Sequence, residues 1–380
     1  MARSAHAYVR GNTLRFYEWL DTVVEGALPS GPPVWICGDC HVGNLGPVAS
    51  AKGDIEIKIR DFDQTVIGNP AHDLIRLGLS LAMAARGSNL PGVTTARMME
   101  SMSQGYIDAF SPLRKRLNFE RPEVVALALK ESKMRTWRHL AQERVEGSTA
   151  RVPLGRRFWA VSKPERDAIM DMVSSSEVQS LISQLGHRDN DAAVEFLDVA
   201  YWMKGCSSLG SLRYAALLDV GKSVARGRDF CLLDIKQAVK AVAPAYSGAG
   251  MPGDNAKRVL EGARNLSPFL GERMAAHKLL NRSVFVRELL PQDLKLEIEK
   301  LDSVQAARCA YYLAWVVGKA HAGQMDNNTR KSWQANLMKD RSKALDAPSW
   351  LWSSVIDLVA SHERGYLEHC RRFAMEHVMA

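Results

Sequence analysis

The chain has 380 residues, of which 46% are hydrophobic and 24% charged, a composition that excludes an intrinsically disordered protein. Its net charge of +8 favours anionic ligands, but Lys and Arg are spread along the chain without a long basic block, so no nucleic-acid partner is expected. The longest apolar run, around Ala310 to Val317, is shorter than the roughly 18 residues of a membrane span. Neither a signal segment nor a disulfide spacing of the cysteines is apparent, so we expect a cytoplasmic protein.

Helical patterns dominate the first half of the chain. Apolar spacing predicts a helix over Ala5 to Val24, which a Gly-Pro-Pro sequence ends. Val34 to Ile36 predict a short buried strand, and the alternation of Ile with charged residues predicts a second strand over Ile55 to Ile59. We expect these two strands to form one hairpin-like unit. From Ala71 to about Leu185 the pattern is helical again.

The second half reads as strands followed by helices. Strands are predicted over Leu212 to Val220, Phe230 to Lys236 and Ser283 to Leu289, with a helix over Asn255 to Leu266 between the second and the third. A long helix over Ser303 to His321 and a final helix after Pro348 complete the chain. The mixture predicts an α+β fold.

Polar residues follow both of the first two predicted strands. The chain reads C-G-D-C-H-V-G-N over Cys37 to Asn44, and later D-F-D over Asp61 to Asp63. Phosphoryl transfer needs a carboxylate that orients or deprotonates the acceptor hydroxyl, and oxygen ligands that hold Mg²⁺ against the phosphates. Asp39 suits the first role, and Asn44 and Asp61 suit the second. Asp63 is either a further metal ligand or a surface carboxylate.

The same segment supports a different interpretation. Cys37, Cys40 and His41 match the C-x-x-C-H attachment site of a c-type haem. This hypothesis leaves Asn44 and the D-F-D sequence unexplained, and covalent haem attachment normally follows export. It is therefore retained only as a remote alternative.

The ordered motifs resemble those of the aminoglycoside phosphotransferase and choline kinase branch of the protein-kinase-like superfamily. That branch carries H-G-D-x-H-x-x-N, then I-D-F/W, then G-x-P-x-x-D-L, and the third piece here spans Gly68 to Leu74. The chain is still more similar to the bacterial domain-of-unknown-function 2252 family, over nearly its whole length. That family typically has Y-R-G near the start, where this chain has Tyr8-Val9-Arg10-Gly11, and N-D-F-D-E, where Arg60 and Gln64 replace the flanking residues. Because the family is largely uncharacterised, the resemblance implies little about function.

The kinase resemblance implies roles for further residues near the motif. His41 would orient the loop of Asp39, and Asp73 would brace that loop by hydrogen bonds to its backbone. Arg10 would meet phosphate or substrate, or form a structural ion pair.

Only 38 residues precede Asp39, too few for the nucleotide-binding lobe that normally comes first in a kinase. The corresponding parts appear later, which implies a circularly permuted, bilobal protein-kinase-like fold. The phosphates would be covered by a small-residue loop with Gly205, Ser207, Ser208 and Gly210. Lys236 would contact the phosphates, and Glu261 would pair with Lys236. A strand with Glu288 and Leu290 would hold adenine by its backbone.

We therefore expect a helical catalytic lobe over residues 1–195, a β-rich nucleotide-binding lobe over 196–297, and helices over 298–380 that return to the first lobe. The expected activity is transfer of the γ-phosphoryl group of ATP, with Mg²⁺, to a hydroxyl of a small molecule. The helices between Gly92 and Leu185 would form the acceptor pocket. Two alternatives remain open: transfer of AMP to a protein, and a pseudokinase-like scaffold that binds nucleotide without turnover.

Overall fold

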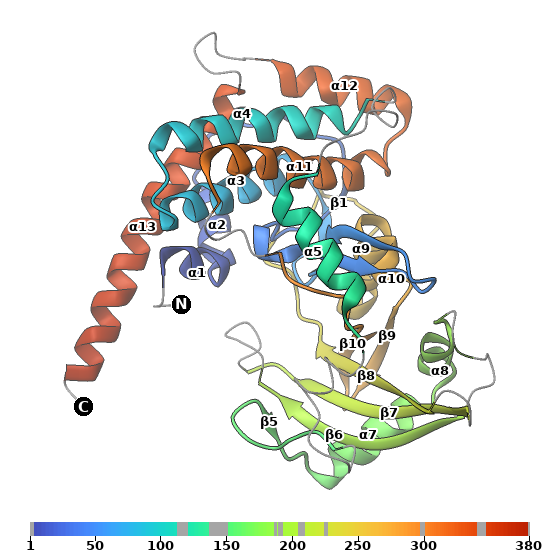
Figure 1. Cartoon of the computed structure of the whole chain (residues 1–380). Coiled ribbons are helices and arrows are strands. Elements are labelled where there is room, and N and C mark those ends of the chain that lie inside the picture. The colour runs from blue at the N-terminus through green and yellow to red at the C-terminus, as the bar shows by residue number, and fades with distance from the viewer. Residues whose placement is uncertain are drawn as a thin grey trace.

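Most helices lie at one end of the molecule and a six-stranded antiparallel sheet at the other, as the computed structural model in Figure 1 shows, so the fold is α+β. The structure describes residues 4–111, 121–136, 151–185, 188, 193–203, 210–223, 227–296, 301–339 and 347–378. Among these residues, no helix is both long enough and apolar enough to cross a membrane.

Two short antiparallel ribbons carry the polar motifs. β1 (Val34–Ile36) pairs with β4 (Val66–Gly68), and β2 (Leu45–Ala49) pairs with β3 (Ile55–Ile59). The prediction that β1 and β3 form one hairpin is wrong, because each has another strand as its partner. Periodicity identifies a strand but says nothing about the strand with which it exchanges hydrogen bonds.

The large sheet has the strand order β5-β6-β7-β8-β10-β9. Its strands are β5 (Phe158–Trp159), β6 (Val194–Trp202), β7 (Arg213–Ser223), β8 (Gly227–Gln237), β9 (Met274–Leu279) and β10 (Arg282–Glu288). The three strands predicted in this region are confirmed as β7, β8 and β10. Sequence reasoning missed β5, β6 and β9. The β9 sequence, M-A-A-H-K-L, is poor in β-branched and aromatic residues.

The elements that pack on the sheet differ from the predicted division of the chain. α7 (Lys163–Val173) and α8 (Ser176–Ser183) bury Ile169, Met172 and Ile182 against it, although the helices before residue 195 were expected in the catalytic lobe. α9 (Asn255–Leu266) packs on β9 and β10, as the predicted division expects, and it also contacts β1, while α10 (Pro268–Gly271) contacts β2, so both helices join the large core at the ribbons. A helical stripe of apolar residues predicts burial, but not the surface that covers it.

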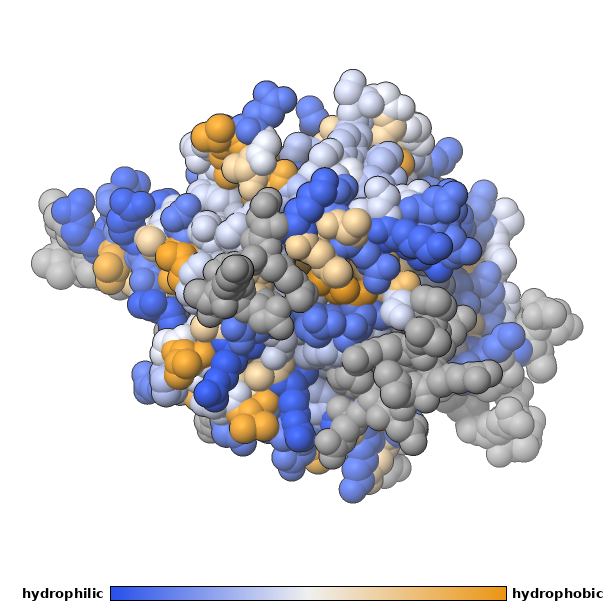
Figure 2. Space-filling view, turned by 90° about the horizontal axis from the view of Figure 1, so that it is seen from above, coloured by the Kyte–Doolittle hydropathy of each residue, from blue (hydrophilic) through white to orange (hydrophobic). Residues whose placement is uncertain are grey.

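The remaining helices lie above and beside the ribbons in Figure 1. They are α1 (Ala5–Arg10), α2 (Thr13–Leu20), α3 (Pro70–Gly87), α4 (Gly92–Asp108), α5 (Glu123–Met134), α11 (Ser303–Ala322), α12 (Asn327–Met338) and α13 (Ser349–Val378). In that view, α4 and α12 lie at the top and α13 runs down the left side. The predicted N-terminal helix is two helices, because the Asn12 side chain accepts a hydrogen bond from the backbone N–H of Arg15 and caps α2. On the face shown in Figure 2, apolar residues form small groups among hydrophilic ones, as is ordinary for a protein surface.

Candidate functional site

A cavity of about 470 Å³ lies where the ribbons, the N-terminal helices and the large sheet meet. Its lining combines polar and charged side chains with several apolar ones. The polar lining includes Arg10, Thr13, Asp39, His41, Asn44, Arg60, Asp61, Asp63, Arg213, Lys236, Arg287 and Lys295. The structure thus brings together Asp39, Asn44, Asp61, Asp63 and Lys236, which come from three separate segments of the sequence.

Two side chains hold the Asp39 carboxylate. Arg76 on α3, which is fully buried, donates from Nε to Oδ1 at 2.8 Å and from Nη2 to the Val9 carbonyl at 2.7 Å. Thr13, the first residue of α2, donates from Oγ1 to Oδ2 at 2.8 Å. Sequence reasoning missed both residues. For Arg76 a signal existed, because it lies three residues after Asp73 and therefore on nearly the same helix face.

Asp73 connects the Asp39 loop to the helical core. Its carboxylate accepts hydrogen bonds from the backbone N–H groups of Cys37 and Gly38, at 2.7 and 2.9 Å. Oδ2 also lies 3.2 Å from Nε2 of His321, whose Nδ1 is 2.8 Å from the Tyr106 hydroxyl. Gly38 has a φ of +74°, and a Cβ there would meet the Gln64 carbonyl oxygen at 2.1 Å, so only glycine fits this turn.

Asn44 and His41 complete the loop. Asn44 donates from Nδ2 to the Asp39 carbonyl at 3.0 Å, which leaves its amide oxygen available as an acceptor or a metal ligand. His41 Nε2 is 3.9 Å from Asp39 Oδ2, too far for a hydrogen bond. Burial lowers the pKa of His41 to about 4 despite the nearby Asp39 carboxylate. The imidazole is therefore neutral at physiological pH.

Asp61, Asp63 and Lys236 form a coupled charge cluster. Lys236, in β8, donates to Asp63 Oδ2, and its side chain is 8% exposed. Burial acts to raise the pKa of Asp61, but the positive charges of Lys236 and Arg287 outweigh it and leave that pKa below its usual range. Burial and the Asp61 carboxylate raise the pKa of Asp63. Asp63 Oδ1 is buried and has no hydrogen-bond partner among the described residues.

Two arginines flank Lys236 on the sheet and share one buried aspartate. Arg213 of β7 donates to both carboxylate oxygens of Asp234, at 2.8 and 2.5 Å, and Arg287 of β10 lies 3.0 Å from Oδ2. The antiparallel register sets Arg213 opposite Lys236 and Arg287 opposite Asp234. The single carboxylate of Asp234 balances only one of these two guanidinium charges. The wall of the cavity formed by Arg213, Lys236 and Arg287 is therefore electropositive.

The residue that links α9 to the D-F-D segment is Arg258, not Glu261. Arg258 donates to the carbonyl oxygens of Asp63 and Val239, at 3.0 and 2.8 Å, and also to that of Thr65. The predicted ion pair between Glu261 and Lys236 is wrong in this structure. Glu261 pairs with Arg264 at 2.9 Å, because it lies on a more exposed part of the helix one turn further on.

The predicted adenine-binding strand does not line the cavity at the predicted residues. Glu288 is buried in an ion pair with Arg188 at 2.8 Å, and its carbonyl oxygen accepts from Arg273 at 2.9 Å. The Leu290 carbonyl accepts from the backbone N–H of Asp293. In the predicted phosphate loop, Gly205, Ser207 and Ser208 lie outside the described residues, while Gly210 has a φ of +79°.

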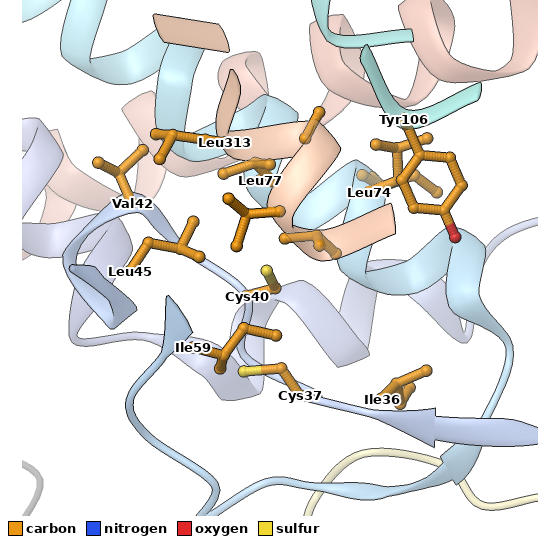
Figure 3. Close-up of a cluster of buried hydrophobic side chains, with 14 of the residues drawn as sticks. Ile36, Cys37, Cys40, Val42, Leu45, Ile59, Leu74, Leu77, Tyr106 and Leu313 are labelled. Atoms are coloured by element: carbon orange, nitrogen blue, oxygen red, sulfur yellow. The ribbon is translucent and has the colours of Figure 1, made fainter. Parts of the chain in front are cut away.

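Both motif cysteines are buried beneath the Asp39 loop. Figure 3 shows Cys37 and Cys40 within the apolar cluster that includes Ile59 and Leu77, and the two side chains are 1% and 0% exposed. Their sulfur atoms and an Asp73 oxygen lie within 4.8 Å of one another, but the Asp73 carboxylate already accepts hydrogen bonds from the loop. Thioether bonds to a haem would require this core to open, so the geometry argues against the haem interpretation.

Acidification from about pH 6.5 to pH 4 is expected to destabilise the fold. Burial lowers the pKa of His362 on α13, like that of His41, to about 4. The unfolded chain binds a proton near pH 6.5 and the folded chain does not, so the free energy of unfolding falls as the pH drops, by at most about 3 kcal/mol for each histidine. Urea unfolding at several pH values measures this, and His362→Leu should flatten the dependence. An equally steep dependence in this variant would contradict the assignment.

The bacterial family DUF2252, described as an uncharacterized protein conserved in bacteria, matches residues 1–372. The chain belongs to this family, as its motifs predict. No curated protein and no solved structure matches it.

Proposed function

We propose that this protein is an ATP- and Mg²⁺-dependent phosphotransferase that moves the γ-phosphoryl group to a hydroxyl of a small molecule. The observation that carries the proposal is the cavity in which Asp39, Asn44, Asp61, Asp63 and Lys236 converge. These are the groups that phosphoryl transfer requires: a base, oxygen ligands for metal and a lysine for phosphate. Asp39 would accept the proton of the acceptor hydroxyl.

The oxygen donors of this cavity fit a magnesium ion. Asn44, Asp61 and Asp63 offer hard amide and carboxylate oxygens, which Mg²⁺ prefers. The buried Asp63 Oδ1, without a hydrogen-bond partner among the described residues, is the kind of atom that a cation would satisfy. Held by these residues, the ion would supply positive charge against the negative charge that develops during transfer.

The rest of the lining fits a nucleotide. Lys236 and the arginines of the electropositive wall would face the phosphates. Val259, Leu270, Met274 and Phe285 contribute apolar surface to the cavity, which would accept a base in place of the predicted strand end at Glu288 and Leu290.

The order of the elements after residue 193 supports a permuted kinase-like arrangement. β6 and β7 flank the predicted phosphate loop, β8 carries Lys236, α9 follows, and β9 and β10 complete the sheet. A phosphate-covering hairpin, a lysine strand and a helix follow one another in the same order in kinases. Here β7, β8 and α9 come after the Asp39 loop in the chain, and Arg213, Lys236 and Val259 on these elements line the same cavity.

Calorimetric titration with Mg-ATP tests the proposal. We expect magnesium-dependent binding by the wild type and a loss of more than about 10-fold in affinity for Asp61→Asn. Substitution of a direct metal ligand should lower the affinity at least as much as substitution of a residue that only hydrogen-bonds to a ligand. Asp54→Asn is the matched control, because Asp54 is exposed in the turn of the same ribbon and does not line the cavity. Absence of binding by the wild type, with or without magnesium, would contradict the proposal. With an acceptor panel, release of ADP rather than pyrophosphate distinguishes phosphoryl from nucleotidyl transfer.

A further inference from the structure

One hydroxyl of the chain already occupies the position that an acceptor needs. Thr13 lines the cavity together with Asp39, Asn44, Asp61 and Lys236. Its Oγ1 donates a hydrogen bond of 2.8 Å to Oδ2 of Asp39. A general base must lie about 2.6–3.2 Å from the oxygen whose proton it removes, and the Thr13 hydroxyl meets this condition without any movement.

We propose that Thr13 is phosphorylated by the protein's own active site, within the same molecule. The proposal rests on the Mg-ATP site described above. The Thr13 oxygen forms a bond to the γ-phosphorus of ATP, and the bond from that phosphorus to the bridging oxygen breaks. The electron pair leaves with ADP, and the threonine proton passes to the Asp39 carboxylate and then to solvent. The products are ADP and one phosphothreonine.

The surroundings of Thr13 suit a phosphate ester. Thr13 is the first residue of α2, where the helix dipole favours negative charge. Arg10, three residues earlier, lines the same cavity and has no hydrogen-bond or ion-pair partner within the described part of the chain. Its guanidinium packs on Gly43, where an added Cβ would lie 2.7 Å from Cζ. An unpaired guanidinium is the usual partner of a phosphorylated side chain.

Modification of Thr13 also removes the hydroxyl that donates to Asp39 and leaves a phosphate beside this carboxylate. Within the described part of the chain no second hydroxyl donates to Asp39, so the modified site should transfer no further group to the protein. We therefore expect a stoichiometry of one phosphoryl group per chain.

The test incubates the purified full-length protein with Mg-ATP, after calorimetry has established whether Mg-ATP binds. Intact-mass and peptide mass spectrometry should find one phosphoryl group on Thr13, at a rate constant independent of protein concentration. Thr13→Ser should become phosphorylated at the serine, Thr13→Val should remain unmodified, and Asp39→Asn should be modified at least about 10²-fold more slowly, while all three still bind Mg-ATP. Thr22→Val is the matched control and should be modified like the wild type, because the Thr22 hydroxyl bonds to the Trp19 carbonyl outside the cavity.

Bound Mg-ATP without any gain in mass would overturn the proposal and leave the nucleotide site intact. A modification that persists in Thr13→Val would also overturn the proposal, and so would a mass gain equal to an adenylyl group. If Mg-ATP does not bind at all, the proposed function fails and self-phosphorylation fails with it.

Discussion

Asp39→Asn is expected to lower the rate of phosphoryl transfer by about 10²–10⁴-fold, the usual contribution of a general base. The amide cannot accept the acceptor's proton, although it has nearly the same shape as the carboxylate. Magnesium-dependent nucleotide binding should persist, because the expected metal ligands, Asn44 and Asp61, are unchanged. Single-turnover transfer to an acceptor from the panel, or to Thr13, measures the rate.

Folding has to be controlled in this variant, because the Asp39 carboxylate is the partner of the buried Arg76. Loss of that pairing destabilises the protein, so the rates are compared at a temperature where circular dichroism shows both proteins folded. Full activity in a folded Asp39→Asn variant would exclude Asp39 as the base.

Asp73→Asn is expected to lower the free energy of unfolding by about 3–5 kcal/mol. The carboxylate is 1% exposed and accepts hydrogen bonds from the backbone of Cys37 and Gly38. In the variant, the amide Nδ2 would face at least one of these donors, and a buried N–H would lose its acceptor. Urea unfolding measures the change.

The matched control for Asp73 is Asp357→Asn. Asp357 is exposed on α13, so its substitution should change stability by no more than about 0.5 kcal/mol. Equal stabilities of the Asp73 and Asp357 variants would mean that the Asp39 loop holds its conformation without the Asp73 brace.

Residues whose role depends on neighbours in the chain were the most predictable. Asp39 and Asn44 lie in one short loop after a strand, and Asp61 follows an alternating strand, so the local pattern suffices to propose a shared site. The helix over Asn255 to Leu266 was predicted with its bounds, since Asp254 caps it through bonds to the backbone of Ala256 and Lys257.

Partners from distant segments were not predictable in the same way. Glu261 and Arg258 are both charged residues of α9, and nothing in their spacing says which of them faces the D-F-D segment. The packing of α9 on the ribbons decides it, and directs Arg258 to the Asp63 carbonyl. Likewise, the pairing of β1 with β4 follows from backbone hydrogen bonds that periodicity does not encode.

The sequence by itself determined the family, the α+β class and the choice of Asp39, Asn44 and Asp61 as candidate site residues, because motifs and caps act over a few residues. Only the tertiary structure decided that Lys236 pairs with Asp63, that Arg76 and Thr13 hold Asp39, and that Cys37 and Cys40 are buried. These contacts join elements far apart in the chain, and their geometry depends on how complete helices and sheets pack against each other.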